Sequence, residues 1–167
     1  MPPPPEPGGG RPPGSGSPGD TAGVPLPPPL IPVGALALAW LLGLLAPLPP
    51  MPRLPLAGDL LALAALGLFV WSLLALRRHR TDVRPDRPTT ALVTEGPYAL
   101  TRNPIYVAMS ALAAGLALVW GNPWAWLAAA AVPVLLDRLV IAREEPYLAR
   151  RFGPAYDAYR ARVRRWL

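Results

Sequence analysis

The sequence predicts an all-α, polytopic membrane protein with about four transmembrane helices and an amphipathic helical segment at its C-terminal end. Long apolar runs separated by short polar links fill the middle of the chain, and 52% of its 167 residues are hydrophobic. Fourteen of the sixteen arginines lie at or beyond Arg77, where they flank these runs. Arginines beside long apolar runs are typical of a membrane protein whose loops set its orientation.

The first thirty residues differ in composition from the rest of the chain. Residues 1–30 contain 12 prolines and 7 glycines. A segment of this kind cannot bury enough apolar surface to fold, so we expect it to be disordered. We therefore divide the chain into a Pro/Gly-rich tail, 1–30, and one membrane domain, 31–167.

Four apolar segments make up the predicted membrane domain. A helix that crosses a bilayer needs about 20 apolar residues, with a range of about 17–25. The third segment is short, but residues 100–120 carry a single charge, Arg102, whose side chain can reach back to the interface. The predicted helices cover 31–48, 56–76, 105–120 and 124–141.

The distribution of arginine predicts how these helices are oriented. The link between the second and third helices and the C-terminal segment are rich in arginine, whereas the other two links contain only Arg53. By the positive-inside rule, the arginine-rich segments and both termini are expected to be cytoplasmic. All sixteen basic residues are arginine, and Ala, Pro and Leu are abundant. This usage indicates a GC-rich genome, so we expect a bacterial cell membrane.

The C-terminal segment has the pattern of an amphipathic helix. A Gly153-Pro154 pair predicts a break in it, with Pro154 in the first turn of a second helix. Periodicity alone favours a helix lying on anionic lipid. The apolar stripe consists of Leu148, Phe152, Tyr156, Tyr159, Val163 and Trp166.

Composition excludes several kinds of site. The chain has no cysteine and one histidine, which excludes disulfides, thiolate metal sites and multi-histidine metal sites. The net charge of +6 could indicate a nucleic-acid partner. Because the arginines flank apolar runs, we expect membrane lipids as partners and no nucleic acid.

The stretch "ALVTEGPYALTRNPIYVAMSALAAG" places turn-forming residues directly before an apolar helix. Asn103 predicts a helix N-cap and Pro104 a first helical residue. Read alone, Tyr98 and Tyr106 would be interfacial aromatic residues, and Arg102 would bind lipid phosphate.

A pair of carboxylates, Glu144 and Glu145, follows the fourth predicted helix. An acidic residue costs about 2.5–3.5 kcal/mol at the membrane centre and less at the interface, so a pair here indicates a ligand site. The link Gly121-Asn122-Pro123 predicts a tight hairpin, which brings the start of the third helix beside the end of the fourth. The residues expected to meet there are Arg102, Asn103, Tyr106, Glu144 and Glu145.

The segments "GPYALTRNPIYVA" and "EEPYLARRFGPAYDAYRARVRRW" together resemble the isoprenylcysteine carboxyl methyltransferase-like family, which includes phospholipid N-methyltransferases. The resemblance covers residues 91–166. It departs from the family at Asn103, where histidine is usual, and at 163–165, where Val-Pro-Arg is common. Asparagine can hydrogen-bond but cannot act as a base near neutral pH. The matching positions are Gly96, Tyr98, Arg102, Pro104, Tyr106, Glu144, Glu145, Leu148, Phe152, Gly153, Tyr156 and Tyr159.

The resemblance implies an S-adenosylmethionine-dependent methyltransferase that acts on a lipophilic acceptor at the cytoplasmic membrane face, without a metal. A carboxylate acceptor needs no base, whereas an amine acceptor must lose a proton, which Glu144 could accept as the catalytic residue. The alternatives are a non-catalytic membrane protein and a relative of NADPH-dependent membrane reductases. The implied cofactor-binding residues are Tyr98, Arg102, Asn103, Pro104, Tyr106, Glu144 and Glu145.

Overall fold

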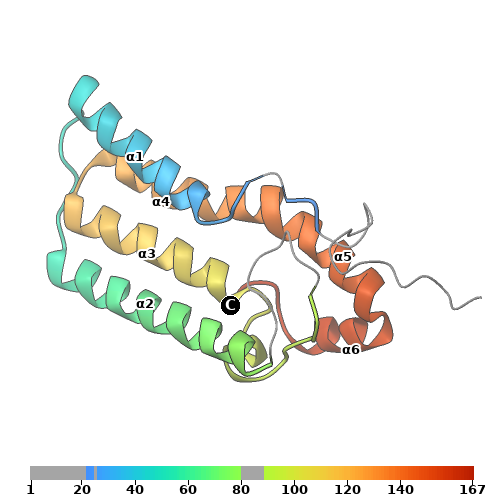
Figure 1. Cartoon of the computed structure of the whole chain (residues 1–167). Helices are drawn as coiled ribbons and strands as arrows, with labels where there is room; N and C mark the ends of the chain where they lie inside the picture. The colour runs from blue at the N-terminus through green and yellow to red at the C-terminus, as the bar shows by residue number, and fades with distance from the viewer. Residues whose placement is uncertain (1–21, 25, 80–88) are drawn as a thin grey trace, which may run out of the picture.

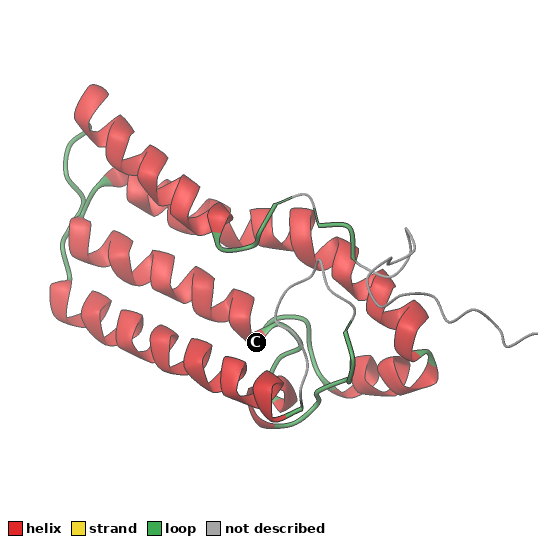
Figure 2. Ribbon diagram, in the orientation of Figure 1, coloured by secondary structure: helices red, strands yellow, loops and turns green. Residues whose placement is uncertain are grey.

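The computed structural model describes residues 22–24, 26–79 and 89–167. The described residues form helices and loops without any strand, which confirms the all-α prediction (Figure 2). The disorder predicted for the tail falls largely on residues 1–21 and 25, outside the described residues. The elements are α1 (Leu30–Leu45), α2 (Pro55–Arg78), the 3-10 turn η1 (Gly96–Ala99), α3 (Pro104–Trp120), α4 (Pro123–Leu136), the π-helical turn η2 (Asp137–Ile141), α5 (Ala142–Phe152) and α6 (Pro154–Arg162).

The four apolar helices lie side by side in a row. Helix α1 packs on α4, α4 packs on α3, and α3 packs on α2, as Figure 1 shows. Helices α5 and α6 extend beyond one end of this row, and the C-terminus returns to the beginning of α3 (Figure 1). The start of α3, α5 and the C-terminal residues are therefore close together.

Two helices are long and apolar enough to cross a membrane. They are α2, with 24 residues, and the continuous helix Pro123–Phe152, with 30 residues. Helices α1 and α3 are apolar as predicted, but they have only 16 and 17 residues. Two candidate spans are therefore established among the described residues, and the count of four stays a prediction.

The prediction that the fourth helix ends at Ile141 is wrong. The helix passes through η2 into α5 and ends only at Phe152. The backbone stays in the right-handed helical region at the junction between η2 and α5. Gly153, with φ 52°, then leaves the helical conformation, as the predicted break requires. The carboxylates of Glu144 and Glu145 consequently project from a helix rather than from a segment that follows one.

The turn between α3 and α4 is a tight hairpin, as predicted. Gly121 ends α3 in the left-handed conformation, with φ 62°. The side chain of Asn122 then caps α4 by accepting a hydrogen bond of 3.0 Å from the backbone N–H of Trp124. Trp124 also donates its indole N–H to the carbonyl of Ala46 at 2.9 Å, which fixes this end of the row to the end of α1.

Helices α2 and α3 touch through glycines. A Cβ atom added at Gly58 would lie 2.6 Å from the carbonyl oxygen of Gly115, and one added at Gly115 would lie 2.8 Å from that of Gly58. Backbones approach this closely where small residues line the contact, which is the usual packing of helices in membranes.

Large apolar side chains point the other way, toward the outside of the row. Leu56 is 74% exposed, Leu63 is 65% exposed and Leu127 is 60% exposed. An extended apolar exterior of this kind indicates contact with lipid. Small residues therefore line the contact between α2 and α3, and many large apolar residues lie on the outside of the row.

We expect Gly58→Ala to destabilise the protein, because the new methyl group would push α2 away from α3. Overpacking of this kind typically costs about 1–3 kcal/mol. The matched control is Gly67→Ala in the same helix, where an added Cβ has no neighbour within 4 Å. Thermal unfolding in detergent should show a lower midpoint for the first variant only. Equal midpoints for the two variants would contradict the close contact.

Candidate functional site

One pocket lies where α3 begins, between α2, α5 and α6. Its wall combines apolar side chains, among them Leu76, Ile105 and Leu148, with charged and phenolic groups. The hairpin explains the location, since it sets the first turn of α3 beside the helix that carries the two glutamates. All seven residues expected to bind a cofactor line this pocket: Tyr98, Arg102, Asn103, Pro104, Tyr106, Glu144 and Glu145. Their role in binding stays a prediction.

The start of α3 differs from the prediction in one respect. Asn103 occupies the N-cap position and Pro104 follows as the first helical residue, but the Asn103 side chain does not cap the helix. Its amide instead donates to the carbonyl of Arg165 at 3.0 Å. Asn103 is buried, so its amide N–H needs a partner, and the returning C-terminal segment supplies one.

Glu144 presents a carboxylate to the pocket. The Tyr106 hydroxyl donates to its Oε1 at 2.7 Å, and Oε2 has no hydrogen-bond partner within the described part of the chain. Tyr98 also lines the pocket. Burial raises the pKa of its phenol well above its usual range, and the nearby Tyr159 and Glu144 raise it further by smaller amounts. The Tyr98 phenol therefore stays protonated at neutral pH and remains able to donate a hydrogen bond.

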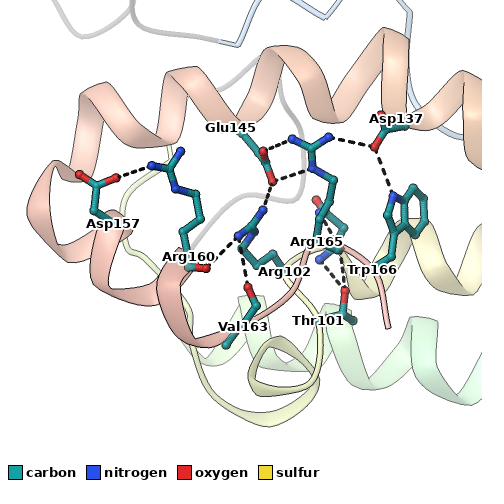
Figure 3. Close-up of polar contacts among 10 residues, drawn as sticks. Thr101, Arg102, Asp137, Glu145, Asp157, Arg160, Val163, Arg165 and Trp166 are labelled. Carbon is teal, nitrogen blue, oxygen red and sulfur yellow. Dashed lines mark hydrogen bonds and ion pairs between the residues drawn. The ribbon is translucent and has the colours of Figure 1, made fainter.

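Glu145 is held by two arginines. Its Oε1 accepts from Nη2 of Arg102 at 2.7 Å and from Nε of Arg165 at 3.2 Å, while its Oε2 accepts from Nη2 of Arg165 (Figure 3). The side chains of Arg102 and Glu145 are only 10% and 12% exposed. Both carboxylate oxygens already accept hydrogen bonds, so Glu145 orients the two arginines.

Arg102 is fixed by its other contacts as well. Its Nη1 donates to the carbonyls of Arg160 and Val163, each at 3.2 Å, and its backbone N–H donates to the carbonyl of Arg164 at 2.9 Å. Its Nε is buried and has no partner among the described residues. An unsatisfied buried donor typically costs about 1–3 kcal/mol, so this nitrogen lowers the stability gained from the other contacts of Arg102.

The central part of the C-terminal stripe is buried in the protein. The rings of Tyr156 and Tyr159 are buried and meet edge to face, and the Tyr159 hydroxyl donates to the carbonyl of Tyr98 at 2.7 Å. The expected helical periodicity does not continue to Trp166. Helix α6 ends at Arg162, and the backbone is extended at Val163, with φ −118° and ψ 131°. The extended backbone lets its carbonyls accept from Arg102 and Asn103.

Comparison with known proteins identifies the family of this site. The model of a family described as phospholipid methyltransferase matches residues 54–155, which is more than half of the chain. The chain belongs to the phospholipid methyltransferase family. Membership in a methyltransferase family that acts on lipids indicates a membrane methyltransferase, in agreement with the resemblance seen in the sequence.

The chain also has a relative in Haemophilus influenzae. The two are 36% identical over 63 residues, which is 38% of this chain and 100% of the relative, a protein described as uncharacterized. No solved structure matches the chain.

In this member of the phospholipid methyltransferase family, the structure adds residues that were not predicted from the sequence. Arg165 and Trp166 belong to the segment that was predicted to form an amphipathic helix, and Asp137 was given no role. All three belong to one polar network beside Glu145 (Figure 3). Thr101 joins it by donating its hydroxyl to the carbonyl of Arg165 at 2.9 Å. The stretch Val163-Arg164-Arg165, which stands where the family often has Val-Pro-Arg, was the one signal in the sequence that pointed toward this segment.

We expect Arg165→Gln to loosen the C-terminal segment, because the substitution leaves Glu145 with one arginine and Asp137 without its guanidinium. Loss of one partner of a partly buried charged group typically costs about 1–3 kcal/mol. Hydrogen exchange of the backbone in residues 160–167 should become faster. The control is Arg164→Gln, whose side chain is exposed and makes no described hydrogen bond. Equal exchange in both variants would contradict a structural role for the Arg165 side chain.

Proposed function

We propose that the chain is an integral membrane methyltransferase that uses S-adenosylmethionine to methylate a lipophilic acceptor at the cytoplasmic membrane face. The observation that carries this proposal is the pocket at the start of α3. It places the Glu144 carboxylate and the buried guanidinium of Arg102 next to apolar side chains of α2, α3 and α5. Such a pocket suits one polar, charged ligand together with one apolar ligand.

The charged groups of the pocket fit S-adenosylmethionine. The cofactor carries an ammonium group and a sulfonium, for which the Oε2 atom of Glu144 is a suitable partner. It also carries a carboxylate, which the nearby positive charge of Arg102 would favour, and hydroxyls, which can accept from the Tyr98 phenol; both residues line the pocket. Tyr106 and Asn103 would hold Glu144 and the C-terminal segment in place around it.

The cofactor supplies a methyl group already activated on its sulfonium, so the protein mainly has to position the two reactants. Orientation of this kind can supply about 7–11 kcal/mol of the barrier. For an amine acceptor, Glu144 would take up the proton at Oε2, while Tyr106 keeps the carboxylate oriented through Oε1. A carboxylate acceptor needs no proton transfer, and Glu144 would then act in binding alone.

Binding of S-adenosylhomocysteine to the purified full chain in lipid nanodiscs tests this function, with NADPH as the comparison ligand. We expect the first to bind and the second not to. Glu144→Gln should weaken binding about ten- to a hundredfold, because a charge-assisted hydrogen bond is worth about 1.5–3 kcal/mol and 1.4 kcal/mol is tenfold. The control is Arg162→Gln, since Arg162 is exposed and bonds only within α6. A folded chain that binds no S-adenosylhomocysteine would overturn the proposal.

We further propose four membrane spans, with both termini in the cytoplasm of a bacterial cell. Helix α1 packs on α4 and exposes large apolar side chains, and α3 packs between α2 and α4, which supports this topology. The pocket and the arginine-rich C-terminal segment lie at the same end of the row, the end that the positive-inside rule places in the cytoplasm.

A reporter protein fused after Leu167 checks the topology. A fluorescent reporter that folds only in the cytoplasm should be active, and an alkaline phosphatase, which needs an oxidising compartment, should be inactive. The opposite pair of results would reverse the orientation and place the pocket on the other side of the membrane.

A further inference from the structure

We propose that Asp137 is a positioning residue for the cofactor pocket and acts on Arg102 through Arg165 and Glu145. The inference rests on the proposed function, because it assigns a role in the same pocket. Asp137 and Arg165 lie outside the pocket wall, whereas Glu145 and Arg102 form part of it. Figure 3 shows the four side chains in one continuous series.

Arg165 lies between two carboxylates. Its Nη1 donates to Oδ1 of Asp137 at 3.2 Å, and its Nε and Nη2 both donate to Glu145. The indole N–H of Trp166 donates to the same Oδ1 of Asp137 at 3.2 Å. Asp137 therefore holds two successive residues of the C-terminal segment. Because the guanidinium of Arg165 is rigid, fixing one side of it at Asp137 also fixes the side that binds Glu145.

The π-helical turn makes this geometry possible. Asp137 and Glu145 are eight residues apart, and eight residues of regular α-helix end about 80° beyond two full turns. The turn Asp137–Ile141 takes up one additional residue, because its hydrogen bonds join residues five apart instead of four. The remaining spacing is equivalent to seven α-helical residues, which lie within about 20° of the same face. Both carboxylates consequently face the same guanidinium.

The charges of the network require Asp137. Two guanidinium groups surround Glu145, and one carboxylate cannot balance both. Asp137 supplies the second negative charge and occupies the Nη1 donor of Arg165. Without Asp137, the guanidinium of Arg165 would be held by Glu145 alone. Glu145 would then be less well positioned, and it would hold Arg102 less firmly. Arg102 lines the pocket, so its guanidinium would then no longer be held in one orientation beside the cofactor.

The test measures the affinity of the full chain in nanodiscs for S-adenosylhomocysteine. We expect Asp137→Asn to weaken binding about three- to tenfold, within the usual range for coupled polar networks. Trp166→Phe, which removes only one donor, should weaken it less and serves as the milder variant if Asp137→Asn folds poorly. The control is Asp157→Asn in α6, whose partner is Arg160 and whose side chain is 60% exposed. This variant should bind like the unsubstituted chain.

A double-mutant cycle distinguishes positioning through Arg165 from general destabilisation. In an Arg165→Gln background, Asp137→Asn should change the affinity by less than twofold, because the residue that links Asp137 to Glu145 is missing. Full additivity of the two substitutions, or unchanged affinity in Asp137→Asn alone, would overturn the inference and leave the proposed function intact. Absence of binding by the unsubstituted folded chain would overturn the proposed function and this role with it.

Discussion

The pairing of Glu145 with two arginines is the interaction on which the pocket depends. Arg102 belongs to the approach to α3, Glu145 to α5, and Arg165 to the segment after α6, so three distant parts of the chain meet at one carboxylate. Burial of a charge is costly unless it is paired and hydrogen-bonded. Removing any of the three side chains would leave a charge uncompensated. The ion pairs among these side chains therefore hold the three segments together.

The membrane imposes a second constraint, which acts on the opposite end of the row. Lipid offers no hydrophobic driving force between helices, so the helices must associate by close packing. Gly58 and Gly115 allow α2 and α3 to touch along their backbones, and the Asn122 turn fixes α3 to α4. With these contacts made at the far end, α3 and the α4–α5 helix have little freedom, and their near ends stay close enough to share a pocket.

The sequence was sufficient to predict what depends on local patterns. The apolar runs predicted the helices, Gly121-Asn122-Pro123 predicted the hairpin, and the hairpin predicted that Arg102 and Glu144 are neighbours. The sequence could not predict which polar groups form hydrogen bonds with residues far away in the chain. The Asn103 side chain could have capped α3 locally, but it donates to the distant carbonyl of Arg165 instead, because its amide is buried and needs an acceptor. The continuation of the fourth helix was missed because a π turn has no reliable pattern in sequence.

The π turn also affects how this helix can change in length during evolution. Deletion of one residue inside Asp137–Ile141 would convert the turn to ordinary α-helix and keep Asp137 and Glu145 on one face. Deletion of a residue between Ala142 and Glu145 would leave the wide turn intact and rotate the glutamates by about 100° away from Arg102. A deletion is therefore tolerable in one turn of the helix and harmful in the next.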